Sequence, residues 1–199
     1  MPETNGKEIG KEKIIEMKDL KKYFPMKKRQ VLKAVDNVTI DIYRGEVLSL
    51  VGESGSGKTT LGRTVSRLYP KTAGDILVDG KPAESYSVKE FTKKIQMIFQ
   101  DPQASLNPRM TVSEIIAEPL IIHKKCKTKE ELNNRVKELM DTVGLSQRLV
   151  NTYPHELDGG RRQRIGIARA LALNPKFIVC DEPVSALDVS IHCLLYTSD

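Results

Sequence analysis

The sequence predicts an α/β fold with a helical insertion, and three stretches indicate it. An apolar run at residues 47–51 leads into a glycine-rich loop, which is followed by apolar residues at helical spacing. Residues 101–156 carry helix-start signals instead. The run at residues 177–180 is apolar again and ends in two acidic residues. A chain of 199 residues is long enough to form one such domain around a buried core.

The first part of the chain shows short strand-like runs separated by turn signals such as Asp79-Gly80. The run at residues 47–51 is apolar except for Ser49, as expected of a buried strand. Beyond the glycine-rich loop, the spacing predicts a helix that ends before Pro70. Its apolar positions are Leu61, Val65 and Leu68, and the other expected strands are residues 14–17, 38–42 and 76–78.

Two capping boxes predict helices within the insertion, one at Thr111 with Glu114 and one at Thr128 with Glu131. The second helix should end at Gly144. Its apolar stripe consists of Leu132, Val136, Leu139 and Val143, which we expect in the core. An arginine-rich helix over residues 161–173, closed by Asn174-Pro175, and a strand over residues 177–180 should follow.

Composition excludes several classes of protein. No apolar run approaches the roughly 20 residues that cross a bilayer, and the polar start lacks the apolar stretch of a secretory signal, so we expect a cytosolic protein. The cysteines Cys126, Cys180 and Cys193 show no metal-binding spacing, and we expect neither zinc nor disulfides. Cys180 should act as a small hydrophobic residue. The net charge of +6 is interpreted as solvated surface rather than a nucleic-acid interface.

Residues 52–60, GESGSGKTT, match the phosphate-binding pattern GxxxxGK[ST]. Glycines let successive backbone N–H groups turn toward one anion, and the following helix adds the positive end of its dipole. We expect Lys58 to reach the β- and γ-phosphates of ATP and the Thr59 hydroxyl to help hold Mg²⁺. The predicted nucleotide-binding residues here are Gly52, Glu53, Ser54, Gly55, Ser56, Gly57, Lys58, Thr59 and Thr60.

Two carboxylates follow the apolar run at residues 177–180. Asp181 at the tip of a buried strand can bind Mg²⁺ through water. Glu182 beside it can position the water that attacks the γ-phosphate. Together with the glycine-rich loop, the pair predicts a nucleotide-hydrolysing site.

The segment LDGGRRQRIGIARAL at residues 157–171 resembles the signature segment of ATP-binding cassette (ABC) ATPases. Together with the other motifs, the resemblance to this family covers nearly the whole chain. It implies a P-loop NTPase with a RecA-like parallel-sheet core, an N-terminal antiparallel β-subdomain and a helical subdomain, incomplete at the C-terminus. We expect one domain over residues 13–199 after a disordered segment at 1–12. Its core would comprise residues 13–100 and 159–191, and its helical subdomain residues 101–158.

The resemblance also implies roles for single residues. Gln100, in MIFQ, resembles the Q-loop residue that contacts Mg²⁺ and the nucleophilic water, and Asp188 closes a segment that resembles the D-loop. Tyr23 lies where the family has an aromatic residue stacked on adenine. Ordinary packing of Tyr23, with Phe24 stacking instead, is the alternative. Asp158, Gly159 and Gly160 occupy signature positions that contact ATP bound on the opposite subunit.

Within that family, residues 99–109, 153–156 and 182–191 look most like ATPase subunits of oligopeptide and dipeptide importers. This implies an ATPase that dimerises head to tail, either with itself or with a related subunit, on the inner face of the cell membrane. Permease subunits would be its direct partners and a peptide-binding protein an indirect one. The cargo stays open among peptides, nickel chelates and glutathione. The alternative is a non-transport ABC ATPase of the ribosome-associated or DNA-repair type, but residues 58–158 lack the heptads of the latter.

The signature departs from the family pattern at two positions, with Asp158 in place of serine and Arg161 in place of glutamine. Asp caps a helix about as well as Ser. Two like charges about 4 Å apart repel by about 4 kcal/mol at an effective dielectric near 20. We therefore hypothesise that Asp158 weakens the site that holds the partner's ATP, while this chain's own P-loop stays competent.

The C-terminal residues depart from the pattern as well. After Ile191 the family pattern continues to a histidine that contacts the γ-phosphate, and His192 is not that residue. Residues 193–199, CLLYTSD, can be encoded by TGT CTC TTA TAC ACA TCT GAC, which resembles a transposon-end sequencing adaptor. We expect residues 193–199 to be a non-native tail, with a genuine divergent C-terminus as the alternative.

Overall fold

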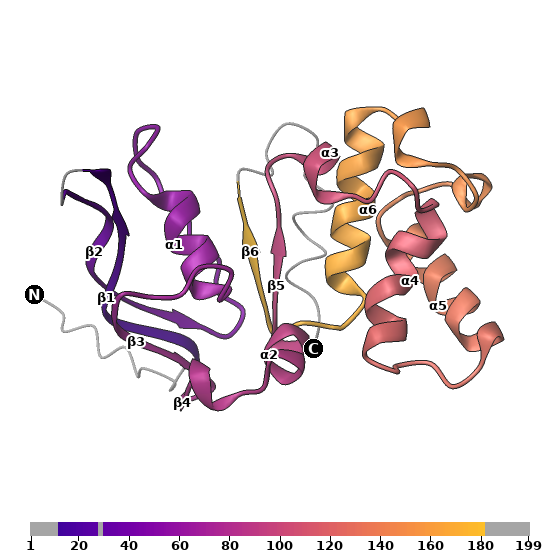
Figure 1. The fold of residues 1–199 in the computed structure, drawn as a ribbon. Helices are drawn as coiled ribbons and strands as arrows, with labels where there is room; N and C mark the ends of the chain where they lie inside the picture. The colour runs from indigo at the N-terminus through magenta and orange to yellow at the C-terminus, as the bar shows by residue number, and fades with distance from the viewer. Residues whose placement is uncertain (1–11, 28–29, 182–199) are drawn as a thin grey trace, which may run out of the picture. The chain divides into compact units, whose positions relative to one another are not determined.

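The computed structural model of the protein describes residues 12–27 and 30–181 (Figure 1). The chain divides into two compact units, Met1–Tyr86 and Ser87–Asp199. The predicted site residues Glu182 and Asp188 and the predicted tail at residues 193–199 lie outside the described residues. Residues 1–11 of the segment predicted to be disordered, residues 1–12, lie outside them as well. The division into one core and one helical subdomain stays a prediction.

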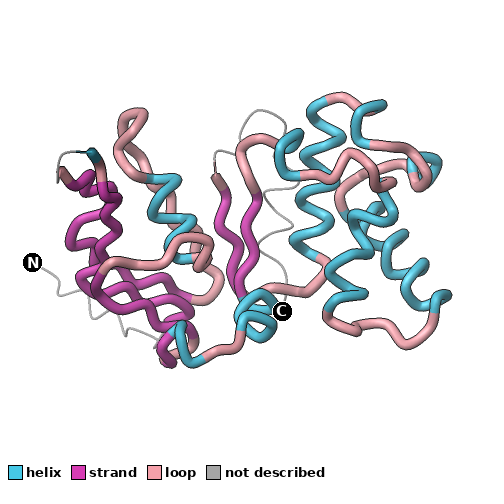
Figure 2. Tube along the Cα trace, in the orientation of Figure 1, coloured by secondary structure: helices cyan, strands magenta, loops and turns pink. Residues whose placement is uncertain are grey.

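The first unit is built on an antiparallel sheet, whose strands are magenta in Figure 2. Its strand order is β2-β1-β3-β4. Residues 14–17, 38–42 and 76–78 all lie in its strands, and the expected antiparallel β-subdomain is confirmed. Its fully buried apolar side chains include Ile15, Leu20 and Val78. The strands are β1 (Lys13–Pro25), β2 (Val31–Tyr43), β3 (Ala73–Val78) and β4 (Lys81–Pro82), followed by the short helix η2 (Ala83–Ser85).

Helix α1 (Lys58–Val65) follows the glycine-rich loop as predicted, with Leu61 and Val65 buried. The prediction that Leu68 continues its apolar face is wrong. The helix ends at Val65, Arg67 takes the left-handed conformation at φ 58°, and the Leu68 side chain is 50% exposed. A non-glycine residue at positive φ breaks the helical path, and the following residues turn away from the buried face.

Residues 47–51 are a second correction. The predicted buried strand is an irregular segment, and the Val51 side chain is 94% exposed. A strand is maintained by hydrogen bonds to neighbouring strands. The ladders described in the first unit join only β1 to β4 and do not include these residues. The apolar pattern of residues 47–51 is typical of a strand. It does not specify a neighbouring strand to which the segment could hydrogen-bond.

The second unit contains a two-stranded parallel sheet of β5 and β6 with helix α6 packed against β5 (Figure 1). The register pairs Ile95 with Phe177 and Ile98 with Cys180. The strand predicted at residues 177–180 is confirmed. The elements in order are α2 (Val88–Lys94), β5 (Ile95–Ile98), α3 (Pro102–Ser105), α4 (Val112–Ile122), α5 (Lys129–Thr142), η3 (Gln147–Leu149), η4 (Pro154–Glu156), α6 (Gly159–Leu171) and β6 (Phe177–Cys180).

Both predicted helix starts in the insertion are present. The Thr111 side chain accepts from the Glu114 backbone N–H, and the Glu114 carboxylate accepts from the Thr111 N–H at 2.7 Å, which completes a capping box. Thr128 likewise accepts from the Glu131 N–H, but the Glu131 carboxylate accepts from the N–H of Lys127 instead. Local side-chain chemistry thus begins α4 and α5 where the sequence indicated.

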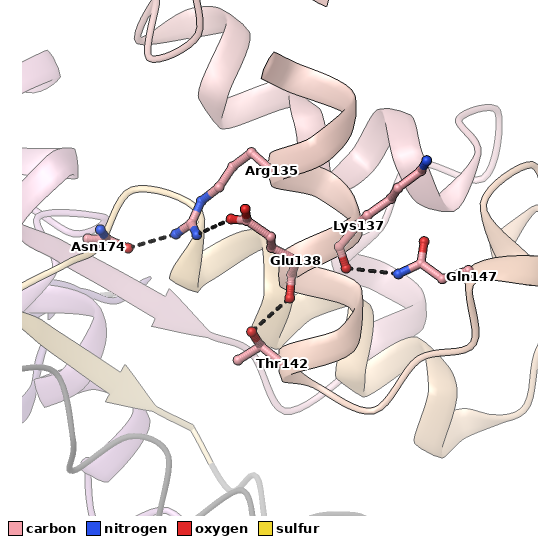
Figure 3. A network of polar contacts seen from close by, with 6 residues as sticks. All are labelled: Arg135, Lys137, Glu138, Thr142, Gln147 and Asn174. Carbon is pink, nitrogen blue, oxygen red and sulfur yellow. Dashed lines mark hydrogen bonds and ion pairs between the residues drawn. The ribbon is translucent and has the colours of Figure 1, made fainter. Parts of the chain in front are cut away.

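Helices α4, α5 and α6 enclose one apolar core in the second unit. Val136, Leu139 and Val143 of the predicted stripe are buried in it. Gly144 ends α5 with φ 68°, as expected of a helix stop. Polar contacts add to this packing: the Arg135 guanidinium binds the Glu138 carboxylate and the Asn174 side-chain oxygen, each at 3.0 Å (Figure 3). The second contact ties α5 to the turn that connects α6 with β6.

Within residues 12–27 and 30–181, no helix is both long and apolar enough to cross a membrane. Cys126 and Cys180 are free thiols. Cys180, predicted to act as a small hydrophobic residue, lies exposed at the end of β6. Its thiol is nevertheless desolvated by neighbouring atoms, which raises the pKa of Cys180 to about 11.

Candidate nucleotide-binding site

The glycine-rich loop is fixed by backbone conformations that require glycine. Gly55 has φ 80° and Gly57 has φ 93°, both in the left-handed region. A Cβ atom on Gly57 would lie 2.1 Å from the backbone oxygen of Ala34 in β2. The loop therefore packs directly against β2 at the start of α1, and a side chain at position 57 would separate them.

Lys58 folds back over this loop. Its ammonium group donates to the backbone oxygens of Gly52 at 2.8 Å and Glu53 at 2.7 Å, and lies 3.4 Å from the Ser56 hydroxyl. An ammonium group has three donors, and all of them face the loop. The positive charge of Lys58 thus lies beside the backbone of the glycine-rich loop.

The N-terminus of α1 is open to an anion. Its N-cap residue, Gly57, contributes no side-chain capping bond, and the first turn contains no acidic residue. Backbone N–H groups at a helix start lack intrahelical partners and carry the positive end of the dipole. Together with Lys58, the first-turn residues Thr59 and Thr60 complete a short segment with the chemistry of a phosphate site.

The two aromatic candidates for a nucleobase occupy different environments in the first unit. The Tyr23 hydroxyl donates to the Asp36 carboxylate, and the Lys33 ammonium lies 5.5 Å from the Tyr23 ring centroid. The hydrogen bond to Asp36 raises the pKa of Tyr23 and lowers the pKa of Asp36. The hydroxyl and the ring of Tyr23 thus both have contacts within the first unit.

Phe24 contacts a different set of residues. Its ring packs edge-on against Tyr69, which follows α1, at a centroid distance of 5.6 Å, and the Lys22 ammonium lies 4.7 Å from its centroid. Arg63 of α1 donates to the Tyr69 hydroxyl at 3.1 Å. Phe24 therefore lies on the side of β1 that faces Tyr69 and, through Tyr69, Arg63 of α1.

Gln100 and Asp181 meet at one edge of the parallel sheet in the second unit. Ile98 and Cys180 are paired, so that Asp181 follows β6 by one residue and Gln100 follows β5 by two. The Asp181 backbone N–H donates to the Ile98 oxygen at 3.0 Å. Asp181 is 6% exposed, whereas Gln100 is exposed. A buried carboxylate at the carboxyl end of a parallel strand is suited to a hard cation.

The signature segment begins α6. Asp158 is the N-cap, and its carboxylate accepts from the Arg161 backbone N–H at 2.7 Å. The Arg161 guanidinium lies 3.5 Å from the second carboxylate oxygen. Gly159 has no heavy atom within 4 Å of the place where a Cβ would stand. The helix start at Asp158, Gly159 and Gly160 is therefore open, and its acidic cap has a cation from its own chain beside it.

A cavity of about 560 Å³ adjoins this helix start, and Arg148, Arg161 and Arg164 all line it. Arg164 donates to the Val143 oxygen at 2.9 Å and so closes the C-terminal end of α5. Because Arg161 faces Asp158, two of the three arginines already have partners. We assign no separate ligand to this cavity.

Among the predicted site residues, the structure brings together residues 52–60 in the first unit and Gln100 with Asp181 in the second. Sequence reasoning missed Asp36 and Ala34, which contact Tyr23 and the glycine-rich loop. It also missed the pairing of Arg161 with Asp158, although their spacing of three residues before an apolar helical run is a signal for contact.

Comparison with known proteins identifies the family to which the chain belongs. The model of the family described as ABC transporter matches residues 35–185. The chain belongs to the ABC transporter family. It is 58% identical over 185 residues to the oligopeptide transport ATP-binding protein OppF of Bacillus subtilis and 53% identical to the dipeptide transport ATP-binding protein DppF of Lactococcus lactis. The alignment with OppF covers 91% of this chain. The chain spans about 60% of the length of these curated relatives.

Solved structures agree with the fold. A dimeric post-hydrolysis state of the ATP-binding cassette MJ0796 bound to ADP and Pi matches with a TM-score of 0.82 and 34% identity, covering 92% of this chain and 81% of that one. CbiO1 of Clostridium perfringens, part of a transporter complex, matches with a TM-score of 0.75 and 26% identity, covering 93% and 73%. The predicted ABC ATPase fold is confirmed by these likenesses.

Proposed function

We propose that the protein to which this chain belongs hydrolyses ATP to energise the import of oligopeptides or dipeptides. The observation that carries the proposal is the likeness to OppF at 58% identity over 91% of the chain. The glycine-rich loop closed around Lys58 supports the nucleotide-binding part of it. The matched relatives named for oligopeptide and dipeptide transport favour this function over a ribosome-associated or DNA-repair ATPase.

The reaction would be transfer of the γ-phosphoryl group of ATP to water. Lys58 would exchange its contacts with the Gly52 and Glu53 oxygens for contacts with the β- and γ-phosphates, and the N–H groups at the start of α1 would bind the same oxygens. Gln100 would orient the attacking water. Glu182 would polarise that water. Stabilisation of charge by donors already in place is the main contribution expected of such a site.

The oxygen donors present fit Mg²⁺, which prefers hydroxyl, carboxamide and carboxylate ligands. Thr59, Gln100 and Asp181 would hold the ion, and the burial of the Asp181 carboxylate favours this assignment. When bound with ATP, Mg²⁺ neutralises charge on the phosphate oxygens. Asp188 and the signature residues would complete the nucleotide contacts.

The partners we propose are a second ATPase subunit, identical or related, and transmembrane permease subunits. The dimeric state of the MJ0796 cassette supports the first. The transporter complex that contains CbiO1 supports the second. A peptide-binding protein would act indirectly, and the ATPase would lie at the inner face of the membrane. No nucleic-acid partner is proposed.

Peptide uptake into proteoliposomes tests this function. The full-length protein that contains this chain would be assembled with its permease subunits and supplied with ATP and a labelled peptide on the appropriate faces. We expect uptake that requires ATP and is lost in Lys58→Met. Competition with nickel chelates and glutathione would identify the cargo class. Co-sedimentation of the protein with ribosomes, together with no ATP-dependent uptake of any of these cargoes, would contradict the proposal.

A further inference from the structure

One partly buried arginine links the signature helix to the segment that follows Gln100. Arg169 lies on α6, and its guanidinium donates to the backbone oxygen of Ser105 at 2.7 Å across a sequence separation of 64 residues. Burial lowers the pKa of Arg169, and the Glu118 carboxylate acts in the opposite direction. A desolvated guanidinium that donates to a carbonyl forms a strong and directional contact.

The acceptor is the last residue of a very short helix. Helix α3 (Pro102–Ser105) has four residues, and a helix of that length does not stabilise itself. Its start is fixed by Asp101, whose side chain accepts from the backbone N–H groups of Gln103 at 2.7 Å and Ala104 at 3.3 Å. The last carbonyl groups of α3 have no hydrogen-bond donor within the helix. Arg169 of α6, the helix against which α3 packs, donates to one of them, the Ser105 carbonyl.

Gln100 lies between two anchored points. On one side, Ile98 is paired with Cys180 and accepts from the Asp181 N–H at 3.0 Å. On the other side, Ser105 is held by Arg169 at 2.7 Å. The path of Gln100 therefore depends on β6 at one end and on α6 at the other. Helix α6 is also the helix that Asp158 begins.

We propose that Arg169 is a positioning residue for Gln100. Its hydrogen bond to the Ser105 carbonyl fixes the segment that contains Gln100 to the signature helix. A displacement of α6 would then be transmitted to the Gln100 segment through this hydrogen bond, in addition to the packing of α3 on α6. This inference rests on the proposed ATPase function, because Gln100 matters to the reaction only there.

A double-mutant cycle in the full-length assembled transporter tests it. Arg169→Met keeps an unbranched apolar stem and removes the donor. We expect kcat for ATP to fall about tenfold or more, with KM nearly unchanged, since small misplacements in a site are costly. Arg169→Lys keeps a donor and should restore part of the loss. In a Gln100→Ala background, Arg169→Met should cost less than about twofold, because residues that act through one another are not additive.

The matched control is Arg135→Met. Arg135 also holds a turn of the second unit, through Asn174 at 3.0 Å (Figure 3). Its partners, Glu138 and Asn174, lie outside the Gln100 segment. Its effect should be the same with and without Gln100. Losses from Arg169→Met and Gln100→Ala that multiply in the double variant would overturn the proposal, and if Arg169→Met does not fold, Arg169→Lys in the same cycle decides. A wild-type transporter that does not hydrolyse ATP at all would instead contradict the ATPase function itself.

Discussion

The Asp158 carboxylate lies 3.5 Å from the Arg161 guanidinium and also accepts a hydrogen bond from the Arg161 backbone N–H at 2.7 Å. The two substitutions in the signature segment are therefore neighbours in space. Both side chains are more than half exposed, at 63% and 55%, and an exposed ion pair of this kind contributes little to stability. Arg161 reduces the negative charge at the helix start without removing it.

Asp158→Ser should therefore raise ATP turnover by the assembled transporter. In the proposed dimer, the serine would remove a charge that repels the γ-phosphate of ATP on the partner subunit, and it would leave the Arg161 cation in place. Arg161→Gln alone should lower turnover, because Asp158 loses its compensating charge. Steady-state phosphate release measures both. Since Ser and Asp cap a helix almost equally, the melting temperature should hardly change, and equal turnover in all three proteins would rule out an effect of Asp158 on the site.

Phe24→Ala and Tyr23→Ala form a matched pair for the nucleobase contact. Phe24 lies on the side of β1 that faces Tyr69, whereas Tyr23 is bonded to Asp36 and covered by Lys33. If Phe24 stacks on adenine, its removal should weaken ATP binding about tenfold, as expected for loss of a base-stacking ring. Tyr23→Ala should change it less than threefold. Titration with a fluorescent ATP analogue distinguishes the two, and the reverse order would restore Tyr23 as the stacking residue.

Gly57→Ala should destabilise the protein by about 2 kcal/mol or more, because the new Cβ meets the Ala34 oxygen and the residue must keep a positive φ. Gly166→Ala is the matched control. It lies within α6 with no atom within 4 Å of its added Cβ, and alanine should stabilise the helix by about 1 kcal/mol. Urea denaturation measures both changes. Equal effects would show that the loop does not need glycine at position 57.

His123 should make the fold less stable in mild acid. Burial lowers the pKa of His123, and the nearby cations Lys93, Lys89 and Lys125 lower it further. The unfolded chain then binds a proton that the folded chain does not, so this stability is present above the unfolded pKa of about 6.5 and is lost as the pH falls through the lower folded pKa.

The unfolding free energy at pH 7.5 and 5.5 measures this dependence. His123→Gln should show a smaller loss between the two values than the wild type. His155→Gln is the control, since His155 is exposed and stacked on Tyr153, and it should keep the full loss. A loss that depends on His155 and not on His123 would contradict the assignment.

Much of the fold could be predicted because its signals are local. Capping at Thr111 and Thr128, the stop at Gly144 and the strand at residues 177–180 depend on residues within a few positions of one another. The strand expected at residues 47–51 was not found, because pairing depends on a partner that no local pattern specifies.

The candidate site divides in the same way. The glycine-rich loop and Asp181 could be predicted, since their chemistry follows from short motifs. The choice between Tyr23 and Phe24 depends on a bulge in the β1–β2 register and on contacts with Asp36 and Tyr69. The contact of Arg169 with Ser105 joins residues 64 positions apart. Such contacts are properties of the packed molecule.

ATP binding by the Lys58→Met variant tests the central claim most directly. The Lys58 ammonium donates to the backbone oxygens of Gly52 at 2.8 Å and Glu53 at 2.7 Å. These contacts can be exchanged for contacts with phosphate oxygens. Lys71→Met, which removes a partly buried cation paired with Glu84 in the same unit, is the control. In equilibrium titrations with a fluorescent ATP analogue, we expect Lys58→Met to lose at least about tenfold in affinity and Lys71→Met to bind like the wild type. Equal affinity in all three proteins would contradict a phosphate-binding role for Lys58.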